Sequence, residues 1–132
     1  MRIVLVEPGK AARSAEIKEG LHSMQEIVDG PIQALYPWDD PVAVICNDEG
    51  KIDQLPLNRV LEDYDIIAGT FFICGIQGEN FSSLTDQYLE KYLQMFFCPE
   101  EFFDTPNGPI CIRLNPMASP KKKEKKPPDY ER

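Results

Sequence analysis

Three polar side chains lie beside apolar stretches of the chain, and their chemical types are those that bind polar groups. Asn47 follows the apolar run 42–46, and Asn58 and Arg59 stand side by side farther along. An amide donates and accepts hydrogen bonds, and a guanidinium presents a planar fork of donors that matches a carboxylate or a phosphate. We therefore take Asn47, Asn58 and Arg59 as candidate binding residues for a carboxylate, phosphate or amide partner.

Each of these residues also has a structural alternative. Asn47 would close a turn at Asp48–Gly50, and Asn58 would cap a short helix. Arg59 would pair with a nearby acid such as Asp63. The sequence leaves both interpretations open.

Residues that would support catalysis are sparse. The sequence has no glycine-rich phosphate loop with a lysine, no Gly-x-Ser-x-Gly motif and no His-Glu-x-x-His motif. His22 is the single histidine, so no second imidazole would assist a nucleophile. The carboxylates Glu62, Asp63 and Asp65 form a cluster that is typical of a solvated surface. We expect no enzyme, no catalytic residue and no cofactor, and we keep a carboxylate-dependent enzyme as the weakest alternative.

The four cysteines, at positions 46, 74, 98 and 111, match neither a zinc-binding nor a redox-dithiol spacing. We therefore expect no metal site. The N-terminus does not read as a signal peptide, and no apolar stretch approaches the roughly 20 residues that span a bilayer. These features predict a cytoplasmic protein with free thiols and no membrane contact.

Apolar runs rich in β-branched residues predict the strands that position the candidate residues. The main strands are expected at 42–47 and 66–74, with a short helical turn from Leu57 that ends before Asp65. The run Arg2–Val6 is almost continuously apolar, which favours a central strand. The segment Ile32–Trp38 is expected to form a hairpin with 42–47.

Two helices are expected from apolar spacing. The first is capped by Ser14, buries Ile17, Leu21, Met24 and Val28 on one face, and ends at Gly30-Pro31. The second begins near Ser83, with Asp86 completing a capping box, and stops before Pro99. A last strand is expected at 110–114. The fold class is therefore α+β: a single mostly antiparallel sheet with two main helices packed against it, in the order β-α-β-β-(turn)-β-α.

The charge distribution divides the chain into an acidic body and a basic end. Residues 1–118 carry 8 Lys and Arg against 19 Asp and Glu, whereas residues 119–132 carry 6 against 3. We expect one domain over 1–117 and a disordered basic tail over 118–132. An acidic body disfavours binding to nucleic-acid phosphates. We expect at most weak contact with nucleic acid, through the lysines of the tail, namely Lys121, Lys122, Lys123, Lys125 and Lys126.

A combination of short motifs resembles a small bacterial family of unknown function that is met in phages, plasmids and conjugative elements. The resemblance covers about residues 1–97, and residues 98–117 read as an individual extension of the domain. The family has no established activity, so the resemblance implies a mobile-element setting rather than a mechanism. The motifs that carry it are Val6–Lys10, Val28–Gly30, Ile45–Lys51, Leu55–Arg59, Asp65–Gly75 and Phe81–Thr85.

Two functional hypotheses of different kinds follow. The first is a non-catalytic accessory module of a phage or mobile element, holding a host or phage protein, or a small polar or anionic ligand, near Asn47, Asn58 and Arg59. The alternative is an acidic mimic of nucleic acid that blocks a host defence or DNA-binding protein. The sequence leaves the oligomeric state open.

Overall fold

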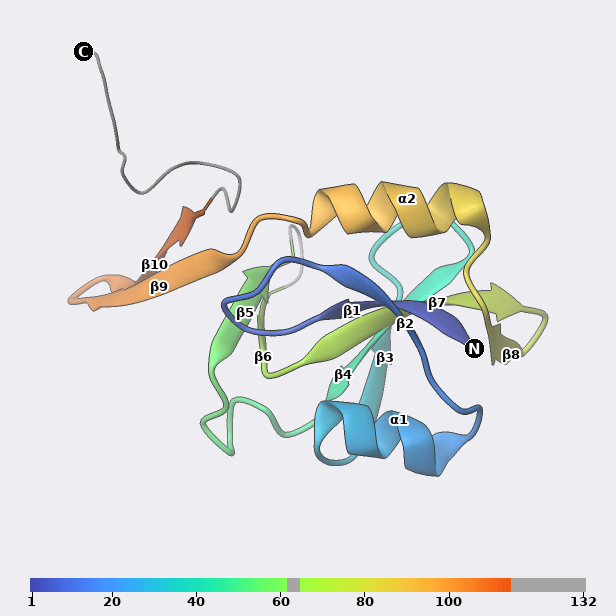
Figure 1. The fold of residues 1–132 in the computed structure, drawn as a ribbon. Helices are drawn as coiled ribbons and strands as arrows, with labels where there is room; N and C mark the ends of the chain where they lie inside the picture. Colours follow the sequence, from blue (N-terminus) through green and yellow to red (C-terminus); the bar gives the residue numbers. More distant parts are fainter. Residues whose placement is uncertain (62–64, 115–132) are drawn as a thin grey trace, which may run out of the picture.

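The computed structural model describes residues 1–61 and 65–114, which form an α+β fold (Figure 1). Two helices and mostly antiparallel strands were expected, and both are confirmed. The helices are α1 (Leu21–Val28) and α2 (Asp86–Met95). The strands are β1 (Arg2–Val6), β2 (Arg13–Glu16), β3 (Ile32–Leu35), β4 (Val42–Asn47), β5 (Leu57–Val60), β6 (Ile66–Ala68), β7 (Phe71–Gln77), β8 (Asn80–Ser82), β9 (Glu100–Thr105) and β10 (Gly108–Arg113).

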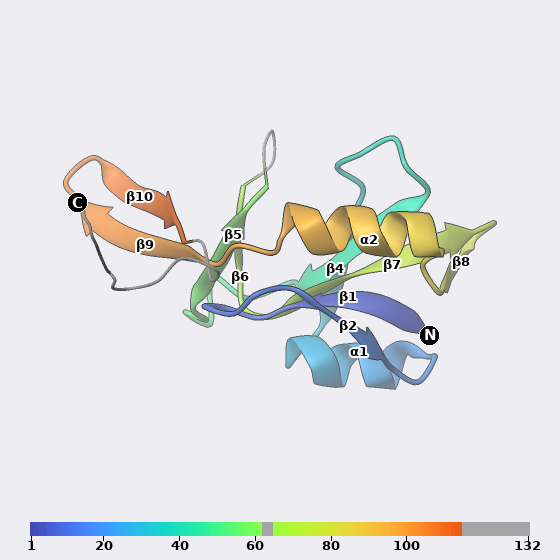
Figure 2. The ribbon, with the colours of Figure 1, turned by 45° about the horizontal axis from the view of Figure 1, so that its top comes forward.

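The central sheet has the strand order β2-β1-β7-β4-β3, and β8 pairs with β7 beyond the end of β1. All neighbouring strands are antiparallel. Helix α2 covers one face and α1 covers the other, as the two views show (Figures 1 and 2). Because both faces are covered, the inner strands β1, β4 and β7 carry apolar residues almost without interruption instead of alternating with polar ones.

The two faces of the sheet bury two separate apolar clusters. On the α2 side, Trp38 lies against Tyr92 with ring centroids 4.6 Å apart, and Phe71 meets Phe96 edge-on at 5.4 Å. On the α1 side, Met24 and its neighbours pack on the alternate residues of the same strands. The sheet therefore holds both helices in fixed positions on opposite sides.

The expected single sheet is not confirmed, because the described strands form three sheets. The predicted strand 66–74 is divided at Gly69, whose φ of 83° lies outside the range of an extended strand. Its first part, β6, pairs with β5 in a separate two-stranded sheet, and its second part, β7, enters the centre of the main sheet. The short helical turn predicted from Leu57 is wrong, since β5 occupies that segment.

The helix starts predicted from capping residues are also wrong. Ser14 lies in β2, where it pairs with Val4, and α1 begins only at Leu21. Helix α2 begins at Asp86, because Ser83 accepts a hydrogen bond from the backbone N–H of Arg2 instead of capping the helix. Contacts with β1 thus decide the local structure at Ser14, through strand pairing, and at Ser83, through the hydrogen bond from Arg2.

Beyond α2 the chain forms a two-stranded hairpin, β9–β10, that projects from the rest of the fold (Figures 1 and 2). It contains the expected last strand and a partner strand that apolar spacing did not indicate. The predicted tail 118–132 lies outside the described residues. Within the described part of the chain, neither helix has the length and apolar content needed to cross a bilayer.

We expect Gly69→Ala to lower the free energy of unfolding by about 2–4 kcal/mol, because a Cβ there would lie 2.8 Å from Leu55 Cδ1 at a positive φ. Gly78→Ala is the matched control: φ is 64° but the space is open, so about 1–2 kcal/mol is expected. Urea denaturation of both variants measures the difference. Equal losses would show that the close approach at Gly69 contributes nothing.

Candidate functional site

The guanidinium of Arg59 lies inside the protein and binds the chain's own carbonyl groups. Its side chain has no exposed surface. Nη2 donates to the backbone oxygens of Lys10 at 2.6 Å and Phe96 at 2.9 Å, and Nη1 donates to Asn58 Oδ1 at 2.8 Å. Burial lowers the pKa of this guanidinium, an effect that the Glu100 carboxylate opposes. Arg59 therefore joins β5 to the loop after β1 and to the end of α2.

Asn58 is equally enclosed and completes the same cluster. Its Nδ2 donates to the backbone oxygens of Val6 at 3.0 Å and Gly69 at 2.8 Å, while its Oδ1 accepts from Arg59. These bonds join three strands at the point where Gly69 turns the chain from β6 to β7. The proposed helix cap at Asn58 is thus replaced by a link between strands.

Asn47 lies in a second cluster and takes the structural role that the sequence had offered as an alternative. Its Oδ1 accepts from the backbone N–H of Glu49 at 2.7 Å, which closes the turn after β4. Its Nδ2 donates to the backbone oxygens of Val28 and Asp29, both at 3.1 Å, at the end of α1. Asn47 also lines a cavity of about 500 Å³ beside the Lys51–Asp65 ion pair.

The structure therefore brings Asn58 and Arg59 together and places Asn47 in separate contacts. Within residues 1–61 and 65–114, no hydrogen bond joins Asn47 to the other two. Asp63, the suggested partner of Arg59, lies outside the described residues. A ligand would reach Asn58 or Arg59 only by breaking bonds that hold the fold together.

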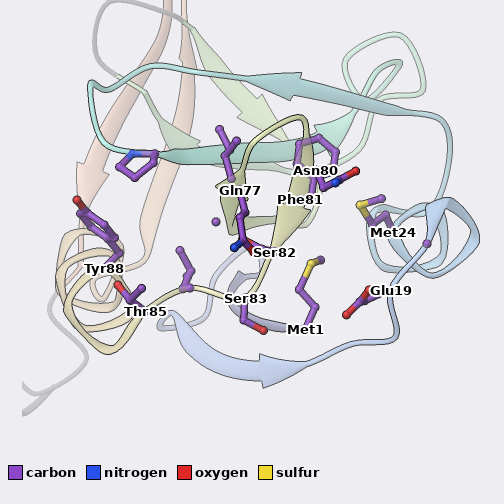
Figure 3. Close-up of a pocket in the computed structure, with 15 residues that line it drawn as sticks. Met1, Glu19, Met24, Gln77, Asn80, Phe81, Ser82, Ser83, Thr85 and Tyr88 are labelled. Atoms are coloured by element: carbon purple, nitrogen blue, oxygen red, sulfur yellow. The ribbon is translucent and has the colours of Figure 1, made fainter.

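A larger cavity, of about 880 Å³, opens at the other end of the central sheet (Figure 3). The hairpin β7–β8 and the segment 83–85 form its middle. The beginnings of α1 and α2 stand on either side (Figure 3). Its polar side chains are amides and hydroxyls, namely Gln77, Asn80, Ser82, Ser83, Thr85 and Tyr88, and Glu19 is its one carboxylate.

Arg2 fixes the segment that forms the middle of this cavity. Its backbone N–H donates to Ser83 Oγ at 2.9 Å, and its backbone oxygen accepts from the N–H of Leu84 at 2.9 Å. Its Nη2 donates to the oxygen of Leu84 at 3.1 Å and to Asp86 Oδ1 at 2.6 Å. The backbone of Ser83 passes so close to Gly75 that a Cβ on Gly75 would lie 2.7 Å from the backbone oxygen of Ser83. The backbone around the cavity is therefore held from two sides.

A polar cluster of Asp40, Lys91 and Tyr92 fixes the wall of the cavity that contains Pro41 and Tyr88. The Tyr92 hydroxyl donates to Asp40 Oδ2 at 2.6 Å, and Lys91 forms an ion pair with the same oxygen. The hydrogen bonds from Lys91 and then Tyr92 lower the pKa of the Asp40 carboxyl group below its usual value. This cluster ties the loop before β4 to α2.

The side chains that line the cavity are mostly uncharged. Among its described lining residues there is no Lys, Arg, His or Cys. Apart from Ser83, its amide and hydroxyl side chains make no hydrogen bond with the described chain, so they are free for a ligand. We did not single out these residues from the sequence, because isolated Ser, Thr and Asn form no motif. The one available signal was Phe81–Thr85, a stretch that carries the family resemblance.

Two buried thiols and one ion-paired carboxylate lie outside this cavity. Burial raises the pKa of the Cys46 thiol to about 11 and of the Cys74 thiol to about 12, so both stay protonated at neutral pH. The pKa of Asp65 is lowered by its hydrogen bond with Lys51. No group of three or more His, Cys, Asp or Glu among residues 1–61 and 65–114 has the arrangement of a metal site.

Asn58→Ala should lower the free energy of unfolding by about 3–5 kcal/mol, since it leaves buried carbonyls and a guanidinium donor without partners. Asn80→Ala, at an exposed position of the cavity, is expected to stay within about 0.5 kcal/mol of the parent protein. Urea denaturation of both variants measures this difference. A stable Asn58→Ala protein would contradict the structural role of the buried cluster.

The stability contributed by Asp40 should be lost in acid. Because its folded-state pKa is lowered, the contribution is complete above about pH 4 and disappears as the pH falls through the folded-state value. Melting temperatures between pH 7 and pH 2 should therefore fall less steeply for Asp40→Asn than for the parent protein. Asp39→Asn leaves the Lys91 and Tyr92 contacts in place and should retain the parent slope; equal slopes for all three proteins would exclude the effect.

Comparison with known proteins gives the family of the chain and nothing about its activity. No curated protein and no solved structure matches the sequence significantly. One family model matches residues 1–97, which include α1, α2 and the complete central sheet but not the hairpin β9–β10. The match covers well over half of the chain, and it confirms the extent that the motifs indicated. The chain belongs to the family described as Domain of unknown function (DUF3846).

Proposed function

We propose that this protein is a non-catalytic accessory binding module of a phage or mobile element, working in the cytoplasm. It holds a polar segment of a protein partner, or a small polar ligand, in the cavity beside β8. The observation that carries the proposal is a cavity of about 880 Å³ whose amide and hydroxyl side chains, apart from Ser83, make no hydrogen bond within the described chain and whose backbone is fixed. The mobile-element setting is supported by the motif resemblance alone.

The charge of the cavity favours neutral or cationic ligands over the anionic ligand that Arg59 had suggested. Glu19 is the one ionised side chain among the described lining residues, and Arg59 is enclosed elsewhere. A carboxylate or phosphate in this cavity would meet one cationic group, the N-terminal amine of Met1, which already donates to the oxygen of Ile17 and pairs with Glu16, so little charge is left to compensate for the loss of its hydration. Asn47, Asn58 and Arg59 accordingly act as positioning residues within the scaffold.

The acidic-mimic alternative is supported by the way the surface cations are used. Five of the eight Lys and Arg residues in the body form ion pairs with carboxylates, and Arg59 is buried. The carboxylates left over give the surface a negative field that would attract a basic protein. Binding through that field should weaken steeply with salt, whereas binding through hydrogen bonds in the cavity should change little.

A protein-observed NMR screen tests the cavity proposal. Neutral and cationic polar compounds, such as nucleosides, sugars and dipeptide amides, are added to the ¹⁵N-labelled full chain at low and high salt. We expect at least one class to shift the amide signals of Gln77 and of residues 80–85, with an affinity that changes less than threefold between 50 and 300 mM salt. Ser82→Phe should weaken these shifts because its ring would occupy part of the cavity next to β8, and Gln33→Ala, in the smaller cavity beside Asn47, is the control.

Two results would contradict this proposal. Shifts that gather around Asn47 and Lys51 would move the site to the smaller cavity. An absence of any specific shift, together with strong salt-dependent binding of a basic protein, would favour the acidic mimic.

A further inference from the structure

Strand β8 has a free edge, and this edge lies inside the cavity. Within the described chain β8 pairs only with β7, through Gly75–Ser82, Ile76–Phe81 and Gln77–Asn80. In an antiparallel ladder, alternate residues direct their N–H and C=O groups away from the partner strand. Of the three residues of β8, one or two therefore direct backbone groups outward, where another strand can bind them.

The surroundings of this edge suit an extended chain. All three residues of β8 line the cavity, and Met1, Gly20 and Met24 line it as well. In Figure 3, β8 runs through the middle of the cavity, with Met24 and Glu19 on one side and Tyr88 and Thr85 on the other. An extended peptide places successive side chains on opposite faces, so it would direct some toward the methionines and others toward the hydroxyl groups.

Carboxylates around the edge determine the charge of the partner. Glu19 lines the cavity, and Glu79 stands at the tip of the β7–β8 turn. Asp86 and Glu16 are paired with Arg2 and with the N-terminal amine, so the net negative charge comes from Glu19 and Glu79. The nearby cations are already engaged: Arg2 binds Asp86, and the amine donates to the oxygen of Ile17. The mouth of the cavity is therefore negative and suits a basic peptide.

We propose that the ligand class of this site is an extended basic peptide that adds to the central sheet as a new strand beside β8. Main-chain hydrogen bonds to β8 supply the affinity, and the carboxylates at the mouth select the charge. This inference rests on the proposed function, since it names the partner of the same cavity. The sheet is thereby extended beyond β8 at the end where β1 no longer covers β7.

The test uses the ¹⁵N-labelled full chain and a synthetic peptide, acetyl-Lys-Val-Thr-Val-Lys-amide. We expect the amide signals of residues 80–82 to shift on titration and their hydrogen exchange to slow. Two comparison peptides separate the contributions: one is N-methylated at alternate residues, which removes ladder donors, and the other has glutamate in place of both lysines. Each should bind at least tenfold more weakly.

Variants of the protein provide the matching arm. Glu19→Gln and Glu79→Gln should each lower the affinity for the lysine peptide about threefold or more, because each removes a negative charge. Neither should lower the affinity for the glutamate peptide. Glu26→Gln, on the exposed side of α1 beside His22, is the control and should leave the affinities for both peptides unchanged.

The outcomes separate this inference from the function on which it rests. Failure of the lysine peptide to bind, or equal binding of its N-methylated form, would overturn strand addition. If small polar compounds still bind at residues 80–85, the cavity proposal stands and only the ligand class is wrong. If neither compounds nor peptides bind, both are wrong.

Discussion

The buried guanidinium of Arg59 is the interaction on which the arrangement of this protein depends. A charged group without solvent is costly unless its hydrogen-bonding capacity is filled, and here backbone carbonyls of two distant segments and the side chain of Asn58 fill most of it. Nε alone has no partner among the described residues. The same contacts bring the loop after β1, strand β5 and the end of α2 into one place, so the charge is stabilised only when all three are correctly folded.

The apolar pattern was sufficient to predict the inner strands and their environment. Continuous apolar runs indicated β1 and β4 with their correct positions, and Ile32–Leu35 pairs with β4 as expected, because burial on both faces leaves a clear signal in the sequence. The edge strands β2 and β8 lacked that signal. They are short, largely exposed or half-buried, and exist because their neighbours offer backbone partners.

The candidate residues show why a polar side chain next to an apolar run is ambiguous. Asn58 and Arg59 have the chemistry of a ligand site, but the backbone carbonyls that meet them come from residues as far away in sequence as Val6 and Lys10. No local pattern contains that information. The cavity beside β8 was missed for the complementary reason: its walls come from four elements, α1, β7, β8 and α2, and from the segments next to them, and each contributes side chains of common types.

Both ends of α2 are attached to other parts of the molecule, Asp86 through Arg2 and the backbone of Phe96 through Arg59. The helix wall of the cavity is therefore in place before any ligand arrives. A binding partner would lose conformational entropy of its own on association, but the backbone of the protein would lose little, because it is already held in place. Preorganisation of this kind favours affinity, and on the proposed function we expect very little change of shape between the free and occupied states.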